Sequence, residues 1–212
     1  MTFLSDWSAE AAFAVVLAGW LGFGVILAVG KKGSAKGAAK RDLKSSVGFL
    51  LQLIAYAIAF GFSRNYFSPL VPMSKTKEEF LSAVTALLAV ASIWFCHTAA
   101  RALGRQWALM ARVIEGHELV RQGPYAIVRN PIYLAMLGML LATGLAIARW
   151  QALLCAVVVF AAGTAIRIRT EEGLLRDAFG AKFDEYARRV PAFLPRLRRS
   201  PGQTGAKTRT SS

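Results

Sequence analysis

Five long apolar runs constrain what this chain can fold into more than any other feature. They are free of Asp, Glu, Lys and Arg and cover Ala11–Val29, Ser45–Ser63, Phe80–Ala100, Pro131–Ala148 and Trp150–Ile166. Each run approaches the roughly 20 helical residues that cross the hydrocarbon core of a bilayer. Lipid cannot satisfy exposed backbone groups, and the runs lack the polar alternation of barrel strands, so helices are expected. We therefore predict an all-α integral membrane protein with about five transmembrane helices.

The last two runs are separated by Arg149 alone, which predicts a tight helical hairpin. Composition supports the membrane class, because 55% of the residues are hydrophobic, 18% are charged and the mean hydropathy is +0.43. Soluble domains carry nearer a quarter charged residues, and disordered chains are poor in apolar ones. Cys96 and Cys155 lie far apart inside apolar runs, which excludes a disulfide framework and a cysteine-rich zinc site.

The basic residues fall almost entirely on one side of this five-helix arrangement. The net charge is +14, and Arg64, Lys75, Lys77 and Arg149 are the four Lys and Arg residues on the other side. By the positive-inside rule, the amino terminus is expected outside and the carboxyl terminus in the cytoplasm. Because the positive charge follows the loops between apolar runs, it predicts contact with membrane lipids and no nucleic-acid partner.

Three regions are expected along the chain. Residues 1–100 form three amino-terminal transmembrane helices, 101–197 form a catalytic region with the hairpin, and 198–212 form a disordered basic tail, rich in Arg, Ser, Thr, Gly and Pro. After the fifth run, an apolar stripe recurs every three or four residues and predicts a cytoplasmic amphipathic helix. Its members are Leu175, Phe179, Phe183, Tyr186 and Val190.

The segment between the third and fourth runs carries more polar residues than a connector requires. Gly123-Pro124 indicates a turn, and Arg129-Asn130-Pro131 indicates a helix start, where Pro is tolerated and Asn can cap. A helix start offers free backbone N–H groups and a positive dipole end. With Arg129 beside them, these groups predict a place where an anion can bind.

A pair of carboxylates follows the fifth run directly. Glu171 and Glu172 lie one turn beyond Arg167, at a depth where carboxylates are costly unless they are paired or functional. Two interpretations stay open: an i,i+4 ion pair between Arg167 and Glu171, or a ligand-binding role for the glutamates.

The segment GHELVRQGPYAIVRNPIYL, followed across the hairpin by RTEEGLLRDAFGAKFDEYARRVPAFLP, resembles the isoprenylcysteine carboxyl methyltransferase family. A more distant likeness is to the phospholipid N-methyltransferases. The resemblance covers roughly residues 101–197, and the ordered combination of its motifs is specific. It implies a membrane enzyme, EC class 2.1.1, that uses S-adenosylmethionine without the soluble Rossmann-type fold. Consistently, the chain has no Gly-x-Gly-x-x-Gly fingerprint after a strand pattern.

The resemblance also implies a site. Its cofactor pocket would be lined by His117, Leu119, Val120, Gly123, Pro124, Tyr125, Arg129, Asn130, Pro131, Tyr133, Glu171 and Glu172. Arg129 and Arg167 are the candidates for holding an anionic nucleophile, and Arg167 matches an arginine that lies near the substrate carboxylate in the prenylcysteine branch. No metal ligand set is expected. The sulfonium methyl is already activated, so attack in line requires positioning and desolvation more than acid or base catalysis.

The methyl acceptor stays open at this point. Many members of the prenylcysteine branch carry His at the position of Asn130 and a residue other than Pro at that of Pro124. A prenylcysteine-like carboxylate is expected first, and a phospholipid amine or a thiol is the alternative. Two further alternatives are a sterol-reductase-like enzyme that uses NADPH and a non-enzymatic membrane accessory protein. Any lipidic acceptor would enter laterally from the bilayer.

Overall fold

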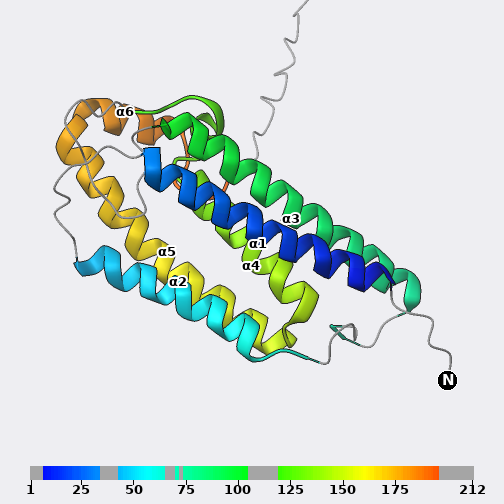
Figure 1. Cartoon of the computed structure of the whole chain (residues 1–212). Coiled ribbons are helices and arrows are strands. Elements are labelled where there is room, and N and C mark those ends of the chain that lie inside the picture. Colours follow the sequence, from blue (N-terminus) through cyan, green and yellow to red (C-terminus); the bar gives the residue numbers. More distant parts are fainter. Residues whose placement is uncertain (1–6, 34–42, 65–69, 72–73, 105–118, 196–212) are drawn as a thin grey trace, which may run out of the picture.

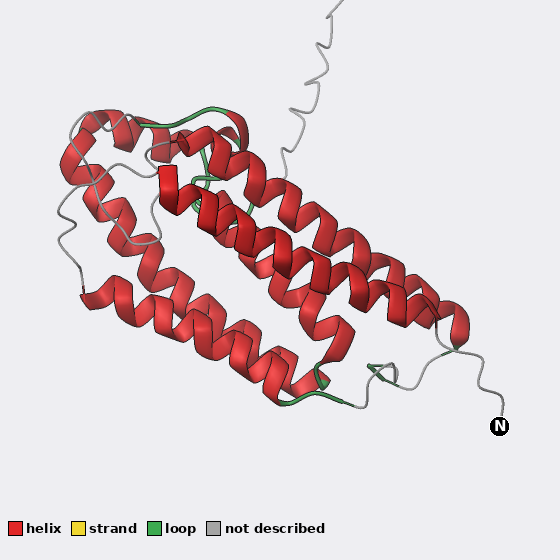
Figure 2. Ribbon diagram, viewed as in Figure 1, coloured by secondary structure: helices red, strands yellow, loops and turns green. Residues whose placement is uncertain are grey.

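The regular elements in the described part of the chain are all helical (Figure 2). The computed structural model describes residues 7–33, 43–64, 70–71, 74–104 and 119–195. Its elements are α1 (Trp7–Gly33), α2 (Leu43–Gly61), α3 (Lys75–Leu103), the 3-10 helix η2 (Gly123–Ala126), α4 (Pro131–Ile147), α5 (Trp150–Phe179) and α6 (Ala181–Arg189). The predicted all-α membrane fold is confirmed.

Four of these helices, α1, α2, α3 and α5, are long and apolar enough to cross a bilayer, so the chain is a multi-pass membrane protein. The fourth apolar run forms the shorter α4, of 17 residues. At about 1.5 Å per residue it is roughly 26 Å long, slightly less than the hydrocarbon core. The tight hairpin is present, since α5 begins three residues after α4 ends.

Arg64 closes the hairpin end of α4. Its guanidinium donates to the carbonyl oxygens of Leu145 at 2.6 Å, Ala146 at 2.9 Å and Ala148 at 2.6 Å. These carbonyls have no partner within the helix, and a cation is favoured at the negative end of the helix dipole. The Arg64 side chain therefore supplies hydrogen bonds to the last carbonyl oxygens of a helix that is shorter than the hydrocarbon core.

The helices form two groups that meet at α4. In one group, α1, α3 and α4 pack side by side, and in the other, α2 packs along α5 (Figure 1). Since α4 also contacts α2 and α5, it lies at the centre of the bundle. Its first residues point to the end of the molecule where α5 continues into α6. The predicted site residues on α4 and α5 are thus brought to one end.

The last helices differ from the sequence pattern at their ends. The fifth apolar run ends at Ile166, but the helix that contains it, α5, continues to Phe179. Its polar extension contains no proline, and the Arg167–Glu171 pair forms within it. The amphipathic stripe was expected on one helix, but the chain breaks at Gly180, whose φ of 52° suits glycine. Leu175 and Phe179 therefore end α5, whereas Phe183 and Tyr186 are buried on α6.

Candidate cofactor and acceptor site

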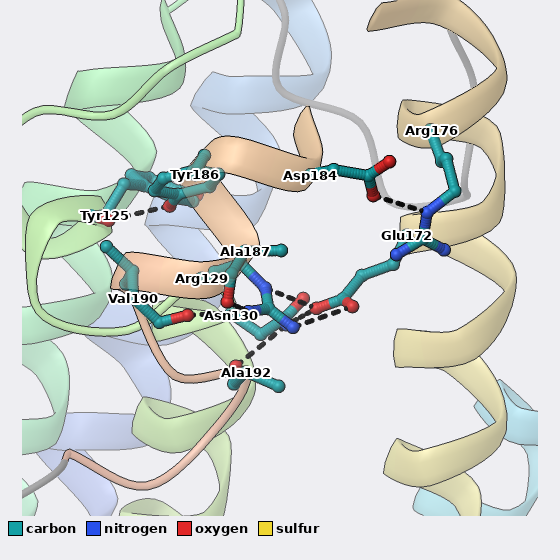
Figure 3. A network of polar contacts seen from close by, with 10 residues as sticks. All are labelled: Tyr125, Arg129, Asn130, Glu172, Arg176, Asp184, Tyr186, Ala187, Val190 and Ala192. Carbon is teal, nitrogen blue, oxygen red and sulfur yellow. Dashed lines mark hydrogen bonds and ion pairs between the residues drawn. The ribbon is translucent and has the colours of Figure 1, made fainter. Parts of the chain in front are cut away.

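The turn before α4 forms as the sequence predicts. Gly123 has a φ of 60° and opens η2, in which Pro124 and Tyr125 are buried. The Tyr186 hydroxyl on α6 donates to the carbonyl oxygen of Tyr125 at 2.6 Å (Figure 3). The turn is therefore fixed to α6, and it also packs against α3.

Arg129 is the centre of the first polar cluster, which we call the Arg129 cluster (Arg129, Asn130, Glu172 and the carbonyls of Ala187, Val190 and Ala192). Its guanidinium donates from Nε to Oε1 of Glu172 at 2.8 Å and from Nη2 to Oε2 at 2.9 Å (Figure 3). Nη1 donates to the carbonyls of Ala187 at 2.8 Å and Val190 at 2.6 Å. Such bidentate pairs are strong and directional. Arg129 therefore joins the start of α4 to α5 and to the end of α6.

Asn130 occupies the cap position of α4, but the prediction that its side chain caps the helix was wrong. Its Nδ2 donates instead to Oε1 of Glu172 at 3.2 Å and to the carbonyl of Ala192 at 2.9 Å. The backbone N–H groups of Arg129 and Asn130 donate to the carbonyls of Pro191 and Ala192. The segment after α6 therefore binds backbone N–H groups that were predicted to be free to bind an anion.

The second polar cluster, the Arg167 cluster, lies deeper and consists of Gln52, Tyr133, Arg167 and Glu171. Arg167 is 4% exposed and donates from Nη2 to Oε1 of Glu171 at 3.2 Å, which confirms the i,i+4 ion pair as geometry. The Tyr133 hydroxyl donates to the same carboxylate oxygen. Arg167 also lies 5.1 Å from the centroid of the Tyr133 ring. This cluster connects α2, α4 and α5.

Adjacent glutamates serve the two clusters because successive residues on a helix point about 100° apart. Glu172 turns to Arg129, and Glu171 turns to Arg167. Their side chains are 13% and 23% exposed, so both carboxylates lie largely out of water. Adjacent glutamates of α5 therefore form two separate ion pairs, one with Arg129 and one with Arg167.

The phenols outside the membrane helices are kept neutral. Burial raises the pKa of Tyr125 well above its ordinary value, and the Glu171 carboxylate adds to the rise. Burial also raises the pKa of Tyr186 to about 12, although the positive charge of Arg129 opposes the rise. Both hydroxyls thus remain donors at physiological pH.

Phe183 fixes α6 beneath this site. Its buried ring lies 6.0 Å from the guanidinium carbon of Arg129 and 5.2 Å from that of Arg176. Arg176 in turn donates to Asp184 at 2.8 Å (Figure 3). A ring between two cations gains from both contacts. α6 is thereby held against α5 and the start of α4.

The structure brings together most of the predicted site residues that it describes. Arg129, Asn130, Tyr133, Glu171 and Glu172 join directly to the two clusters, together with Arg167. Pro124, Tyr125 and Pro131 are buried beside them, Gly123 is exposed, and Leu119 and Val120 are half-buried ahead of η2. His117 lies outside the described residues. The cofactor and catalytic roles of these residues stay predictions.

Gln52 is not among the predicted site residues, because it lies within an apolar run of the sequence. The available signal was a primary amide in the middle of a membrane helix, where polar groups face other helices. The sequence also gave no sign that backbone carbonyls after α6 would complete the surroundings of Arg129. Those contacts depend on how the chain returns to α4 and not on residue type.

Residues 80–182 match the family model described as phospholipid methyltransferase. This segment, slightly less than half of the chain, is similar to that family, within the group of membrane methyltransferases that resembles the isoprenylcysteine carboxyl methyltransferases. The matched segment contains both arginines and both glutamates of the two clusters. The resemblance found in the sequence is confirmed at the level of the family.

Two curated relatives carry names from metal resistance. The chain is 36% identical over 111 residues to the cobalt-zinc-cadmium resistance protein CzcN of Cupriavidus metallidurans, covering 52% of this chain and 51% of that protein. It is 37% identical over 99 residues to the nickel-cobalt-cadmium resistance protein NccN of Alcaligenes xylosoxydans xylosoxydans, covering 45% of each. The chain thus spans about half the length of the curated relatives it matches.

Metal-ligating side chains do not gather within the described ranges, where no three His, Cys, Asp or Glu residues come close enough to hold an ion. The absence of a metal site therefore stays a prediction for the chain as a whole.

Proposed function

We propose that this chain is a membrane methyltransferase that moves a methyl group from S-adenosylmethionine to an anionic acceptor attached to a lipid. A prenylcysteine-like carboxylate is the acceptor class that we favour. The observation that carries the proposal is the pair of clusters whose arginines and glutamates all lie in the family-matched segment. Arg129 with Glu172 and Arg167 with Glu171 lie next to each other, with Tyr125 and Tyr133 beside them.

The chemistry of these residues fits the cofactor. Its amino-acid end is a zwitterion, for which an arginine and a glutamate are the matching partners. Arg129 and Glu172 are such a pair, only 12% and 13% exposed. Glu171 offers a carboxylate to an ammonium or to ribose hydroxyls, and the Tyr125 ring suits an adenine face. We therefore assign cofactor binding to the Arg129 cluster, with Glu171 and Tyr125.

The charge of the site favours an anionic acceptor. The two arginines and two glutamates balance one another, whereas the cofactor carries two positive charges and one negative charge. A site largely removed from water does not keep an extra positive charge cheaply. A carboxylate or thiolate beside Arg167 would restore neutrality, and a protonated amine would add to the excess. The buried Arg167 is thus the group we assign to the acceptor.

The protein's task in this reaction is positioning. S-adenosylmethionine, when bound, supplies a sulfonium methyl that is already activated for transfer. A carboxylate acceptor has no proton to lose, so Arg167 needs only to hold it in line while the surrounding helices exclude water. Tyr133 keeps Glu171 in place by donating to it. The proposed reaction therefore requires neither Glu171 nor Glu172 to act as a base.

Calorimetry and a methyl-transfer assay test this proposal. Purified protein should bind S-adenosylhomocysteine in a saturable manner and should not bind NADPH. It should then methylate a farnesylated cysteine analogue in preference to phosphatidylethanolamine or a small volatile thiol. Activity should rise with the apolar length of the acceptor, since each buried methylene contributes about 0.8 kcal/mol. Binding of NADPH alone would favour the reductase alternative, and preference for the amine headgroup would reject the role of Arg167.

A further inference from the structure

Gln52 is a buried amide on α2, outside the segment that matches the family. Its side chain is fully buried, at 0% exposure, inside a helix that is otherwise largely apolar. Burying an amide without hydrogen bonds costs on the order of several kcal/mol. Its presence there therefore requires partners, and those partners show what it does.

Both ends of the amide are engaged with α5. Nε2 donates to Oγ1 of Thr164 at 2.9 Å, and Oε1 accepts from Nη1 of Arg167 at 3.3 Å. Thr164 lies one turn before Arg167 on the same helix, so the two contacts are stacked along α5. Because Thr164 fixes the direction of the amide, the oxygen of Gln52 must face the guanidinium.

The neighbours of Gln52 on α2 also shape the surroundings of Arg167. Gly48 lies one turn earlier, and a Cβ there would stand 2.6 Å from Cγ of Arg167. The bare backbone therefore makes room for the stem of Arg167. The Phe49 ring lies 5.5 Å from its guanidinium carbon, on the α2 side of the cluster. Three nearby positions on α2 thus hold one side chain of α5.

We propose that Gln52 is a positioning residue for methyl transfer, one that holds the Arg167 guanidinium in the orientation in which it receives the acceptor. This inference rests on the proposed function, because it takes Arg167 as the acceptor-binding cation. Gln52 holds Nη1 and Glu171 holds Nη2, so two supports fix the plane of the guanidinium. Without Gln52, the group pivots about its contact with Glu171. The first half of the chain thereby contributes to the reaction.

The test removes Gln52 or the threonine that orients it, and it measures the acceptor kinetics separately from cofactor binding. Gln52→Leu keeps a side chain of similar size without hydrogen bonds, and Thr164→Val frees the amide to turn. Thr143→Val is the matched control. Thr143 is also a buried threonine whose Oγ1 accepts a hydrogen bond from another helix, in this case from Nε1 of Trp20 at 3.1 Å.

With a farnesylated cysteine analogue, Gln52→Leu should lower kcat roughly tenfold or more, because misplacement by about 1 Å can cost a hundredfold. Thr164→Val should lower kcat less, and Thr143→Val should leave it unchanged. The affinity for S-adenosylhomocysteine should stay within about twofold in all three, a separation that general loosening of the bundle would not produce.

Three results would overturn the inference. One is an unchanged kcat in folded Gln52→Leu; another is an equal fall in Thr143→Val, which would mean that any lost interhelical bond slows the enzyme. If the wild-type protein neither binds S-adenosylhomocysteine nor methylates the analogue, the proposed function fails and the role of Gln52 fails with it. If wild type does both and the Gln52 variant matches it, only the positioning role fails. Should Gln52→Leu not fold, Thr164→Val carries the same comparison.

Discussion

Arg129 shows how one side chain can serve both fold and site. It contacts Glu172 on α5 and the carbonyls of Ala187 and Val190 at the end of α6, so any anion that it binds must share it with those partners. Replacing Arg129 would therefore disturb α6 as well as a ligand. Glu172 is the cleaner position to change, because the loss of its charge can be separated from the packing of its side chain.

At Glu172, the substitution Glu172→Gln keeps the shape and removes the charge. We expect S-adenosylhomocysteine affinity to fall by about 1.5–3 kcal/mol, the range for a hydrogen bond to a charged group. Isothermal titration calorimetry on the folded variant measures this loss. Asp184→Asn is the matched control, since it breaks an ion pair with Arg176 whose side chains are about half exposed and should leave affinity unchanged. Equal affinities in wild type and Glu172→Gln would remove Glu172 from the cofactor site.

Sequence predicted the members of the site better than their contacts. Arg129, Arg167 and the two glutamates stand out because charged residues are rare beside membrane helices and because their order matches a family. Gln52 could not be found in this way. Nothing in a run of apolar residues fixes which face of α2 meets α5, and a single amide has no periodicity. Its role depends on the rotation of one helix about its axis, which only the packed structure defines.

At the scale of elements, the helices were predictable and their ends were not. Hydrophobicity located four helices that can cross a bilayer and the shorter apolar α4, because the bilayer sets the length and composition of such segments. Hydrophobicity could not predict that α5 continues past Ile166, because the charged residues there are stabilised by ion pairs that only the folded structure shows. Nor could it place the break at Gly180, where the apolar stripe continues across two helices.

The close packing of α2 against α5 predicts that a substitution at Gly163 lowers stability. A Cβ at Gly163 would stand 2.7 Å from the carbonyl oxygen of Gly48 and 2.9 Å from Cβ of Leu51, so the two backbones must separate to admit a methyl group. Gly163→Ala should therefore destabilise the protein by about 1–3 kcal/mol, as overpacking does. Thermal unfolding in detergent should show a lower Tm.

Gly24→Ala provides the comparison for this substitution. Gly24 is exposed on α1, and a Cβ there meets nothing within 4 Å. Alanine is the better helix former by up to about 1 kcal/mol, so this variant should be as stable as wild type or more so. A higher Tm for Gly163→Ala as well would show that α2 and α5 are not in such close contact at Gly163.

At the scale of the whole molecule, the site belongs to helices from both halves of the chain. The family match begins within α3, yet α2 packs along α5 and reaches Arg167 through Gln52. The predicted boundary at residue 100 thus separates segments that share one cluster of contacts. The Arg129 cluster lies where α4 begins and near the end of the bundle where α5 continues into α6, so the orientation of the bundle decides which compartment it faces.

The distribution of Lys and Arg predicts the orientation of the bundle in the membrane. Arg64 and Arg149 lie at the hairpin end of α4 and α5, and with Lys75 and Lys77 they form the side that holds four of the 26 basic residues. The Arg129 cluster lies at the opposite end, where α4 begins and α5 continues into α6. Because cytoplasmic loops attract Lys and Arg, this cluster should face the cytoplasm. A reporter fused after Ser212 should then read cytoplasmic, and one inserted at Lys75 should read external. If both reporters gave the reverse, Arg129 and Glu172 would face the outside, and a cytoplasmic cofactor would have no direct path to them.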